Sequence, residues 1–155
     1  MTINSQTLQN VQNKTRDFFD FLDPTVTIIP RVVEEILFID VSTTDPDDQT
    51  LIGNKGDILF SLQLLLSLVL NREEAEPLQV VLDVNEYRVR REKALQELMQ
   101  RVVEQVETTG NSYELEPMRP FERRIIHVIL QDFPELDSFS VGEEPNRRVV
   151  IKKRD

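Results

Sequence analysis

The segment from Ile58 to Leu70 constrains the fold more than any other part of this chain. Only Ser61, Gln63 and Ser67 interrupt its apolar residues. It is too short to span a bilayer, so we expect no membrane insertion and predict a buried helix. A helix that is apolar almost all round must be covered on more than one side. The cover is either a sheet together with a second domain, or a subunit or partner that uses this helix as an interface.

The composition places the chain among ordinary globular proteins. It has 155 residues, of which 39% are hydrophobic and 30% charged, a length that suits one domain or two small ones. The absence of cysteine excludes a disulfide framework and thiolate metal sites, and fits a reducing, cytoplasmic location. The polar N-terminal stretch Met1 to Arg16 lacks the apolar core of a secretory signal.

The charge is strongly negative but unevenly distributed. The net charge of −10 argues against a general nucleic-acid binder. The first fifty residues carry nine acidic and three basic side chains, whereas residues 81–155 carry fifteen and thirteen. Any contact with a polyanion is therefore expected in the second half.

The hydrophobic pattern predicts an α+β protein. In the first half we expect a helix, two strands, the apolar helix and a third strand, at Gln6–Leu22, Thr25–Val33, Glu35–Val41, Gly56 to Arg72 and Leu78–Val84. In the second half we expect a long helix, a short strand, a helix and two strands, at Glu86–Thr108, Tyr113–Glu116, Pro120–Asp132, Leu136–Val141 and Arg147–Lys153. Because the connector Glu73–Pro77 is too short for a flexible tether, we place the domain boundary near Asp83, where the Leu78–Val84 strand gives way to the long helix. The predicted domains are residues 1–82 and 83–155.

Two closely spaced glycines, Gly53 and Gly56, precede the apolar helix, with Asn54 and Lys55 between them. Glycines let the backbone turn tightly and approach a ligand, and the free N–H groups at a helix start favour an anion. A Gly-x-x-Gly loop of this kind clamps single-stranded nucleic acid in KH domains. The alternative is a strand-to-helix turn without a ligand. Asp57 favours that alternative, because its carboxylate satisfies the helix dipole and repels a phosphate.

A second candidate site follows Pro120, which is well suited to open a helix. Arg123 and His127, the only histidine, then lie one turn apart. With Gln131 they form a polar stripe opposite the apolar residues, flanked by Arg124, and we expect this stripe to be exposed. A guanidinium and an imidazole so placed can share a phosphate or a base. The alternative is a purely structural histidine.

Basic residues gather again near the C-terminus, at Arg147, Arg148 and Lys152 to Arg154. One interpretation is a frayed charged tail. The other is a binding strand, in which alternation sends Arg147 and Arg148 to opposite faces.

The motifs of common enzymes are missing from the sequence. It has one histidine, no cysteine, no Gly-x-Ser-x-Gly elbow and no Walker loop. We therefore expect a protein that is not an enzyme and that has no cofactor and no catalytic or metal site.

Several segments resemble the bacterial Jag family, whose members are also called KhpB or EloR. The resemblance covers roughly Phe18 to Lys153 and is most specific in the second half. Its segments are Leu82 to Glu92, Glu114 to Met118, Glu122 to His127 and Arg147 to Ile151. The family carries a KH domain followed by a domain named for its Arg-x-x-x-His signature, written R-3-H. Arg123 and His127 match that signature, and the Leu51–Gly56 segment matches the KH loop position.

The resemblance implies a type II KH-like domain, a three-stranded sheet with helices on one face, followed by an R-3-H domain of three short strands and two helices. It implies a cytoplasmic single-stranded RNA-binding protein, a post-transcriptional regulator linked to cell elongation and division. The implied RNA contacts are the Gly53–Gly56 loop with Arg123, Arg124, His127, Arg147 and Arg148. The family also pairs with a small stand-alone KH protein, and the Ile58–Leu70 helix is compatible with such pairing or with self-association.

The sequence departs from the family in three places. It has no room for the extra N-terminal domain that Jag proteins usually carry. Asn54 replaces one of two basic loop residues, and Asn146 stands where an aromatic residue is frequent. The alternative to RNA binding is therefore a protein-interaction module with the same two-domain scaffold and weak or lost RNA affinity.

Overall fold

The computed structural model describes residues 5–72 and 76–154. The N-terminal residues 1–4, most of the predicted connector at 73–77, and residue 155 lie outside the described residues. The chain forms two compact units, residues 1–88 and 89–155. Each unit is considered by itself below.

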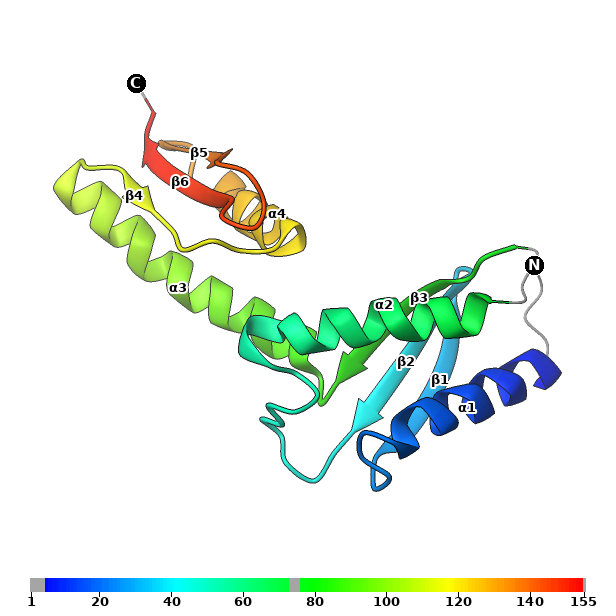
Figure 1. Cartoon of the computed structure of the whole chain (residues 1–155). Helices are drawn as coiled ribbons and strands as arrows, with labels where there is room; N and C mark the ends of the chain where they lie inside the picture. Colours follow the sequence, from blue (N-terminus) through cyan, green and yellow to red (C-terminus); the bar gives the residue numbers. More distant parts are fainter. Residues whose placement is uncertain (1–4, 73–75, 155) are drawn as a thin grey trace. The chain divides into compact units, whose positions relative to one another are not determined.

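The first unit is a three-stranded sheet with two helices on one face (Figure 1). Strands β1 (Thr27–Val33) and β2 (Ile36–Ser42) are antiparallel, and β3 (Gln79–Val84) runs parallel to β2 at the other edge. The helices are α1 (Ser5–Asp20) and α2 (Asp57–Asn71), and a short 3-10 turn, η1 (Asn54–Gly56), precedes α2. A parallel β2–β3 pair requires a crossover, and α2 supplies it. This is the type II KH-like arrangement expected for this half.

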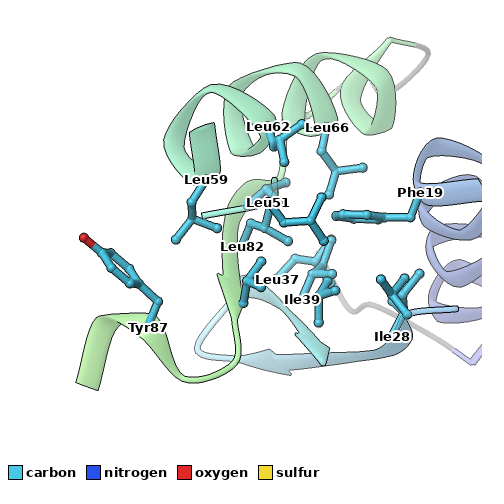
Figure 2. Packing of buried hydrophobic residues seen from close by; sticks show 14 of the residues in the cluster. Phe19, Ile28, Leu37, Ile39, Leu51, Leu59, Leu62, Leu66, Leu82 and Tyr87 are labelled. Atoms are coloured by element: carbon cyan, nitrogen blue, oxygen red, sulfur yellow. The ribbon is translucent and has the colours of Figure 1, made fainter. Parts of the chain in front are cut away.

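The core of the first unit lies between the helices and the sheet. Phe19 of α1 and Leu59, Leu62 and Leu66 of α2 point toward the strands in Figure 2. The strands contribute their alternate residues, including Leu37, Ile39, Val80, Leu82 and Val84. The helical residues recur every three or four positions and the strand residues every second position, which are the periods of one buried face in each element.

Only one side of α2 is covered. Leu59, Leu62, Leu66 and Leu70 are buried, whereas Leu64 and Leu68 are 63% and 62% exposed. Three neighbours are also exposed, namely Ile58, Leu65 and Val69. The first unit by itself therefore covers one side of this helix, and the expected cover of its other side stays a prediction. Within the described residues no helix is long and apolar enough to cross a membrane.

The second unit has two helices and a three-stranded antiparallel sheet. The long helix α3 (Tyr87–Thr109) begins at the end of the first unit, and β4 (Tyr113–Glu114), α4 (Pro120–Ile129), the 3-10 turn η2 (Leu130–Asp132), β5 (Leu136–Val141) and β6 (Arg148–Lys153) follow. Strand β6 lies in the middle, in the order β4-β6-β5. Residues of α3, such as Met99 and Val102, and Ile126 of α4 share one core with Val149 and Ile151 of β6. This is the small α+β unit expected for an R-3-H domain.

The predicted helices and strands are all present, with ends shifted by one or a few residues. The largest difference is in the last predicted helix, which tightens into η2 after Ile129. The boundary between the compact units lies after Arg88 rather than after residue 82. The reason is local, because Arg88 donates hydrogen bonds to Gln63 Oε1 (2.8 Å) and to Leu82 O (3.3 Å) and so belongs to the first unit.

Candidate nucleic-acid interface

The start of α4 is held by a buried carboxylate. Glu122 is 1% exposed, and its Oε2 accepts a hydrogen bond of 2.9 Å from the backbone N–H of Arg119. Its Oε1 accepts a bond of 2.6 Å from Nε of Arg91 on α3. A buried carboxylate needs such partners to offset its lost hydration. The Glu122–Arg91 ion pair therefore fixes the first turn of α4 against α3, and with it the position of the next turn.

Arg123 lies inside the protein, not on its surface. It is only 8% exposed. Its Nη1 donates to the carbonyl oxygen of Met118 and its Nη2 to Oε1 of Glu144, both at 2.7 Å. The expected exposure of the stripe was wrong at this position, because the Met118 carbonyl and Glu144, in the loop at residues 142–147, bind the guanidinium. Arg123 is thus tied to that loop.

His127, one turn further on, is half-buried and faces β5. Its Nδ1 lies 2.7 Å from the hydroxyl oxygen of Ser138, and its Nε2 lies 3.1 Å from that of Ser140. Burial lowers the pKa of His127 below its ordinary value, and the nearby Arg123 guanidinium lowers it further. The imidazole is therefore neutral at pH 7, with one nitrogen donating and the other accepting. Gln131, the third member of the predicted stripe, is exposed.

Two other predicted arginines reach solvent beside this arrangement. Arg124 follows Arg123 on α4 and is exposed. Arg147 is also exposed, and its backbone carbonyl accepts a bond from the N–H of Met118, the residue whose own carbonyl holds Arg123. Among the residues that the structure describes, neither Arg124 nor Arg147 has a side-chain partner. Both cations are therefore available to an anionic ligand.

Arg148 differs from Arg147 in its partner and in its face. Its Nη1 forms an ion pair of 2.9 Å with Oε1 of Glu114, and both side chains are partly exposed. Its place in the β5–β6 register, opposite Val141, puts it on the same face of the sheet as Val150. Exposed pairs of this kind contribute about 0–1 kcal/mol, so a phosphate can replace Glu114.

The Gly53–Gly56 loop belongs to the first unit. Both glycines have positive φ, and a Cβ at Gly56 would lie 2.7 Å from Cε1 of Tyr87. Lys55 is exposed and lies in the left-handed region, and Asn54 beside it is exposed as well. The loop thus has the tight backbone that was predicted.

A carboxylate already occupies the start of α2. Oδ1 of Asp57 accepts a bond of 2.8 Å from the N–H of Ile58. A Cβ at Gly53 would collide with this same oxygen, so the carboxylate lies directly against the loop. An anion arriving at the helix N-terminus has to displace Asp57 or bind beside it. This geometry weakens the loop as a phosphate site.

The structure therefore brings Arg123, His127 and Arg147 together in one unit and leaves the Gly53–Gly56 loop in the other. Sequence reasoning missed Glu144, Ser138 and Ser140 as partners. Ser138 and Ser140 alternate along β5, which places both hydroxyls on one face of the strand. This pattern points to a partner for His127 only once the fold shows that His127 faces β5. Within the described residues no cluster of three or more potential metal ligands exists.

Comparison with known proteins identifies the family of this chain. A family model of the R-3-H domain matches residues 93–153. The chain is 37% identical over 153 residues to "RNA-binding protein KhpB" of Clostridium symbiosum, covering 96% of this chain and 69% of the relative. Proteins of the same name from Bacillus subtilis and Streptococcus pneumoniae are 37% and 30% identical over 106 and 146 residues. Those matches cover 67% and 94% of this chain, and 51% and 44% of the relatives.

The fold and the domain match define a protein of two small α+β units, a KH-like unit followed by an R-3-H domain. The chain belongs to the KhpB family, also called Jag. It spans about half to two thirds of the length of these three relatives.

Proposed function

We propose that this chain is a non-catalytic, single-stranded RNA-binding protein of the cytoplasm that acts in post-transcriptional regulation, and that its R-3-H unit makes the main RNA contact. Its relatives from Clostridium symbiosum and Bacillus subtilis, each named an RNA-binding protein, support this assignment. The protein's net charge of −10 repels RNA over most of its surface. Binding therefore depends on a local group of available cations.

The observation that carries the proposal is the pair Arg124 and Arg147, which are exposed and have no side-chain partner among residues 5–72 and 76–154. Arg124 follows Arg123 on α4, and the backbone carbonyl of Arg147 accepts a bond from Met118, whose own carbonyl binds Arg123. In the proposal these two arginines bind phosphates. Arg123 acts as a positioning residue that holds the loop at residues 142–147 against α4.

His127 and the two serine hydroxyls form a neutral, hydrogen-bonded group rather than a charged one. Ser138 and Ser140 occupy both ring nitrogens of His127. A hydroxyl has one donor site and two acceptor sites, so each serine keeps a further site that suits a base edge or a ribose 2′-OH. In the proposal His127 orients these two hydroxyls.

The Gly53–Gly56 loop is a second, weaker contact in this proposal. Lys55 offers one phosphate contact, and Asn54 a polar one. The Asp57 carboxylate opposes both. We therefore expect Asp57→Asn to strengthen RNA binding and Lys55→Ala to weaken it only slightly.

The test is a titration of a labelled single-stranded RNA of about twelve nucleotides, at salt concentrations of about 50 and 200 mM. The logarithm of the association constant should fall with the logarithm of salt by roughly 0.7 per phosphate contact. Arg124→Ala and Arg147→Ala should each lower the affinity and reduce that slope by about 0.7.

Arg101→Ala is the matched control, because it removes the same charge from an exposed position on α3 in the same unit. It should change affinity little. Absence of RNA binding at the lower salt concentration would refute the proposed function. Equal effects of the Arg101, Arg124 and Arg147 variants would show that only net charge matters and that the site is misplaced.

The exposed side of α2 favours a second role, a protein interface. Leu64, Leu65, Leu68 and Val69 form an apolar strip on a helix whose other side is already packed. Exposed strips of this kind mark interaction surfaces. We propose that this strip packs against a second KH-like unit, either in another copy of this chain or in a small stand-alone KH protein.

Sedimentation velocity of the chain, alone and mixed with such a KH protein, tests this interface. Leu68→Glu should abolish association, because it buries a charge in an apolar contact. Gln63→Glu, which introduces the same charge at a half-buried position of the same helix, is the control. Association that persists in the Leu68 variant would place the interface elsewhere.

A further inference from the structure

The sheet of the second unit has one face toward the helices and one face away from them. Val149, Ile151 and Leu136 are buried in the core with α3 and α4. The alternate residues therefore point to the other side. We call these residues the open sheet face. They are Asp137, Phe139 and Val141 of β5, Arg148, Val150 and Lys152 of β6, and Glu114 of β4.

An aromatic ring lies near the centre of the open sheet face. Phe139 is 43% exposed and pairs directly with Val150 of the central strand. Its diagonal neighbours on that strand are Arg148 and Lys152, opposite Val141 and Asp137. Diagonal side chains on one sheet face lie about 7–8 Å apart, within reach of long side chains. The ring thus has a cation on each side along β6.

We propose that Phe139 is a stacking platform for one unpaired base of a bound single-stranded RNA, with Arg148 and Lys152 beside the adjoining phosphates. The proposal rests on the RNA-binding function proposed above. Sheet aromatics that stack bases, next to basic side chains, are a recurrent solution for single strands, because every base offers a π-face.

The open sheet face carries more positive charge than the chain as a whole, which suits an RNA ligand. Arg148 pairs with Glu114, and Arg154 pairs with Asp137 at 2.8 Å. Among the described residues, Arg148 and Lys152 of this face and Arg154 just beyond β6 thus stand against the carboxylates of Glu114 and Asp137, in a protein whose net charge is −10. The Arg148 and Arg154 pairs are partly exposed, and such pairs are easily exchanged for a phosphate.

The size of the apolar area argues for a base and against a protein. Phe139 is the only exposed large hydrophobic residue of the described part of this sheet, and Val141 and Val150 beside it are half-buried. A stable protein interface needs about 800 Å² from each partner, whereas one ring with two flanking valines offers room for a single base. Charged groups surround that ring on both strands.

The first experiment uses Phe139→Trp. The chain contains no tryptophan, so this variant has a single indole, at the proposed platform. Its fluorescence should be quenched on addition of single-stranded RNA, and the RNA affinity should equal or exceed that of the wild type. An abasic oligonucleotide of the same length is the matched ligand, and it should leave the fluorescence nearly unchanged.

The second experiment compares Phe139→Ala, Phe139→Leu and Phe139→Tyr in the full chain at low salt. Loss of one stacked base should weaken RNA binding about tenfold to a hundredfold in the Ala and Leu variants, and Tyr should retain wild-type affinity. On the abasic ligand all four proteins should bind alike. A urea-unfolding midpoint equal to that of the wild type within experimental error establishes that a variant is folded.

The outcomes separate this inference from the function on which it rests. If the wild type binds no RNA, the proposed function fails and stacking fails with it. If the wild type binds RNA but the Phe139→Leu variant binds it as tightly, Phe139 is not a platform although RNA binding stands. The same holds if RNA does not quench the fluorescence of the Phe139→Trp variant. A loss that is equal on abasic and intact ligands also overturns the proposal, since it shows no contact with a base.

Discussion

The burial of Arg123 leads to a prediction that separates it from its neighbour. Replacing Arg123 with alanine leaves the carbonyl of Met118 without its donor and breaks the pair with Glu144. A hydrogen bond from a charged donor to a buried acceptor contributes about 1.5–3 kcal/mol. The Glu144 side chain is 54% exposed and rehydrates, so its pair adds at most about 1 kcal/mol. We expect Arg123→Ala to lower the free energy of unfolding by about 2–4 kcal/mol.

Arg124→Ala is the matched control, since Arg124 is the next residue of α4 but is exposed and has no side-chain partner in the described chain. It should change stability by less than about 0.5 kcal/mol. Urea denaturation followed by circular dichroism gives both values. Hydrogen-exchange protection of the β5 and β6 amides assigns the loss to the second unit. Equal stability of the two variants would refute the buried position of Arg123.

Three further predictions follow from individual contacts. Gly56→Ala should cost about 2–4 kcal/mol, because φ is positive and the added carbon meets Tyr87. Gly110→Ala, also at positive φ but with nothing within 4 Å, should cost only about 1 kcal/mol, and equal midpoints in urea would contradict the steric argument. Arg91→Ala should cost about 3–5 kcal/mol by leaving a buried carboxylate unpaired. Adding Glu122→Gln should recover part of that loss, and a double variant that is less stable than the single one would argue against this cause. Since the pKa of His127 is lowered in the folded protein, the unfolded chain binds more protons below about pH 6.5. Stability should therefore fall as pH drops through that range, by at most about 1.4 kcal/mol per pH unit from this group, and the fall should be smaller in His127→Gln, as pH-dependent urea denaturation would show.

The order of helices and strands could be predicted because it depends on local properties. Helical spacing predicts Leu95, Leu98, Val102 and Val106 as one face of α3. Leu95, Val102 and Val106 are buried in the structure, and Leu98 is partly buried against the same core. Pro120 opens α4 where expected. Such signals involve residues within a few positions of one another, so they can be read without knowing the fold.

The environment of the candidate site could not be read in the same way. A helical projection separates polar from apolar positions but does not show what covers them. Arg123 lies on the polar side of α4, yet it is buried and donates a hydrogen bond to Glu144, twenty-one residues further along the chain. The apolar side of α2 illustrates the converse, because Leu64 and Leu68 are apolar and still exposed.

The sequence by itself determined the two α+β units, the Gly53–Gly56 turn before α2, and the one-turn spacing of Arg123 and His127, because backbone preferences and hydrophobic period act over short distances. The tertiary structure decided which of these groups meet a ligand. It buried Arg123, oriented His127 with two serines, left Arg124 and Arg147 exposed, and placed Phe139 on the open sheet face. These outcomes depend on strand register and on contacts between distant residues, which local sequence preferences do not specify.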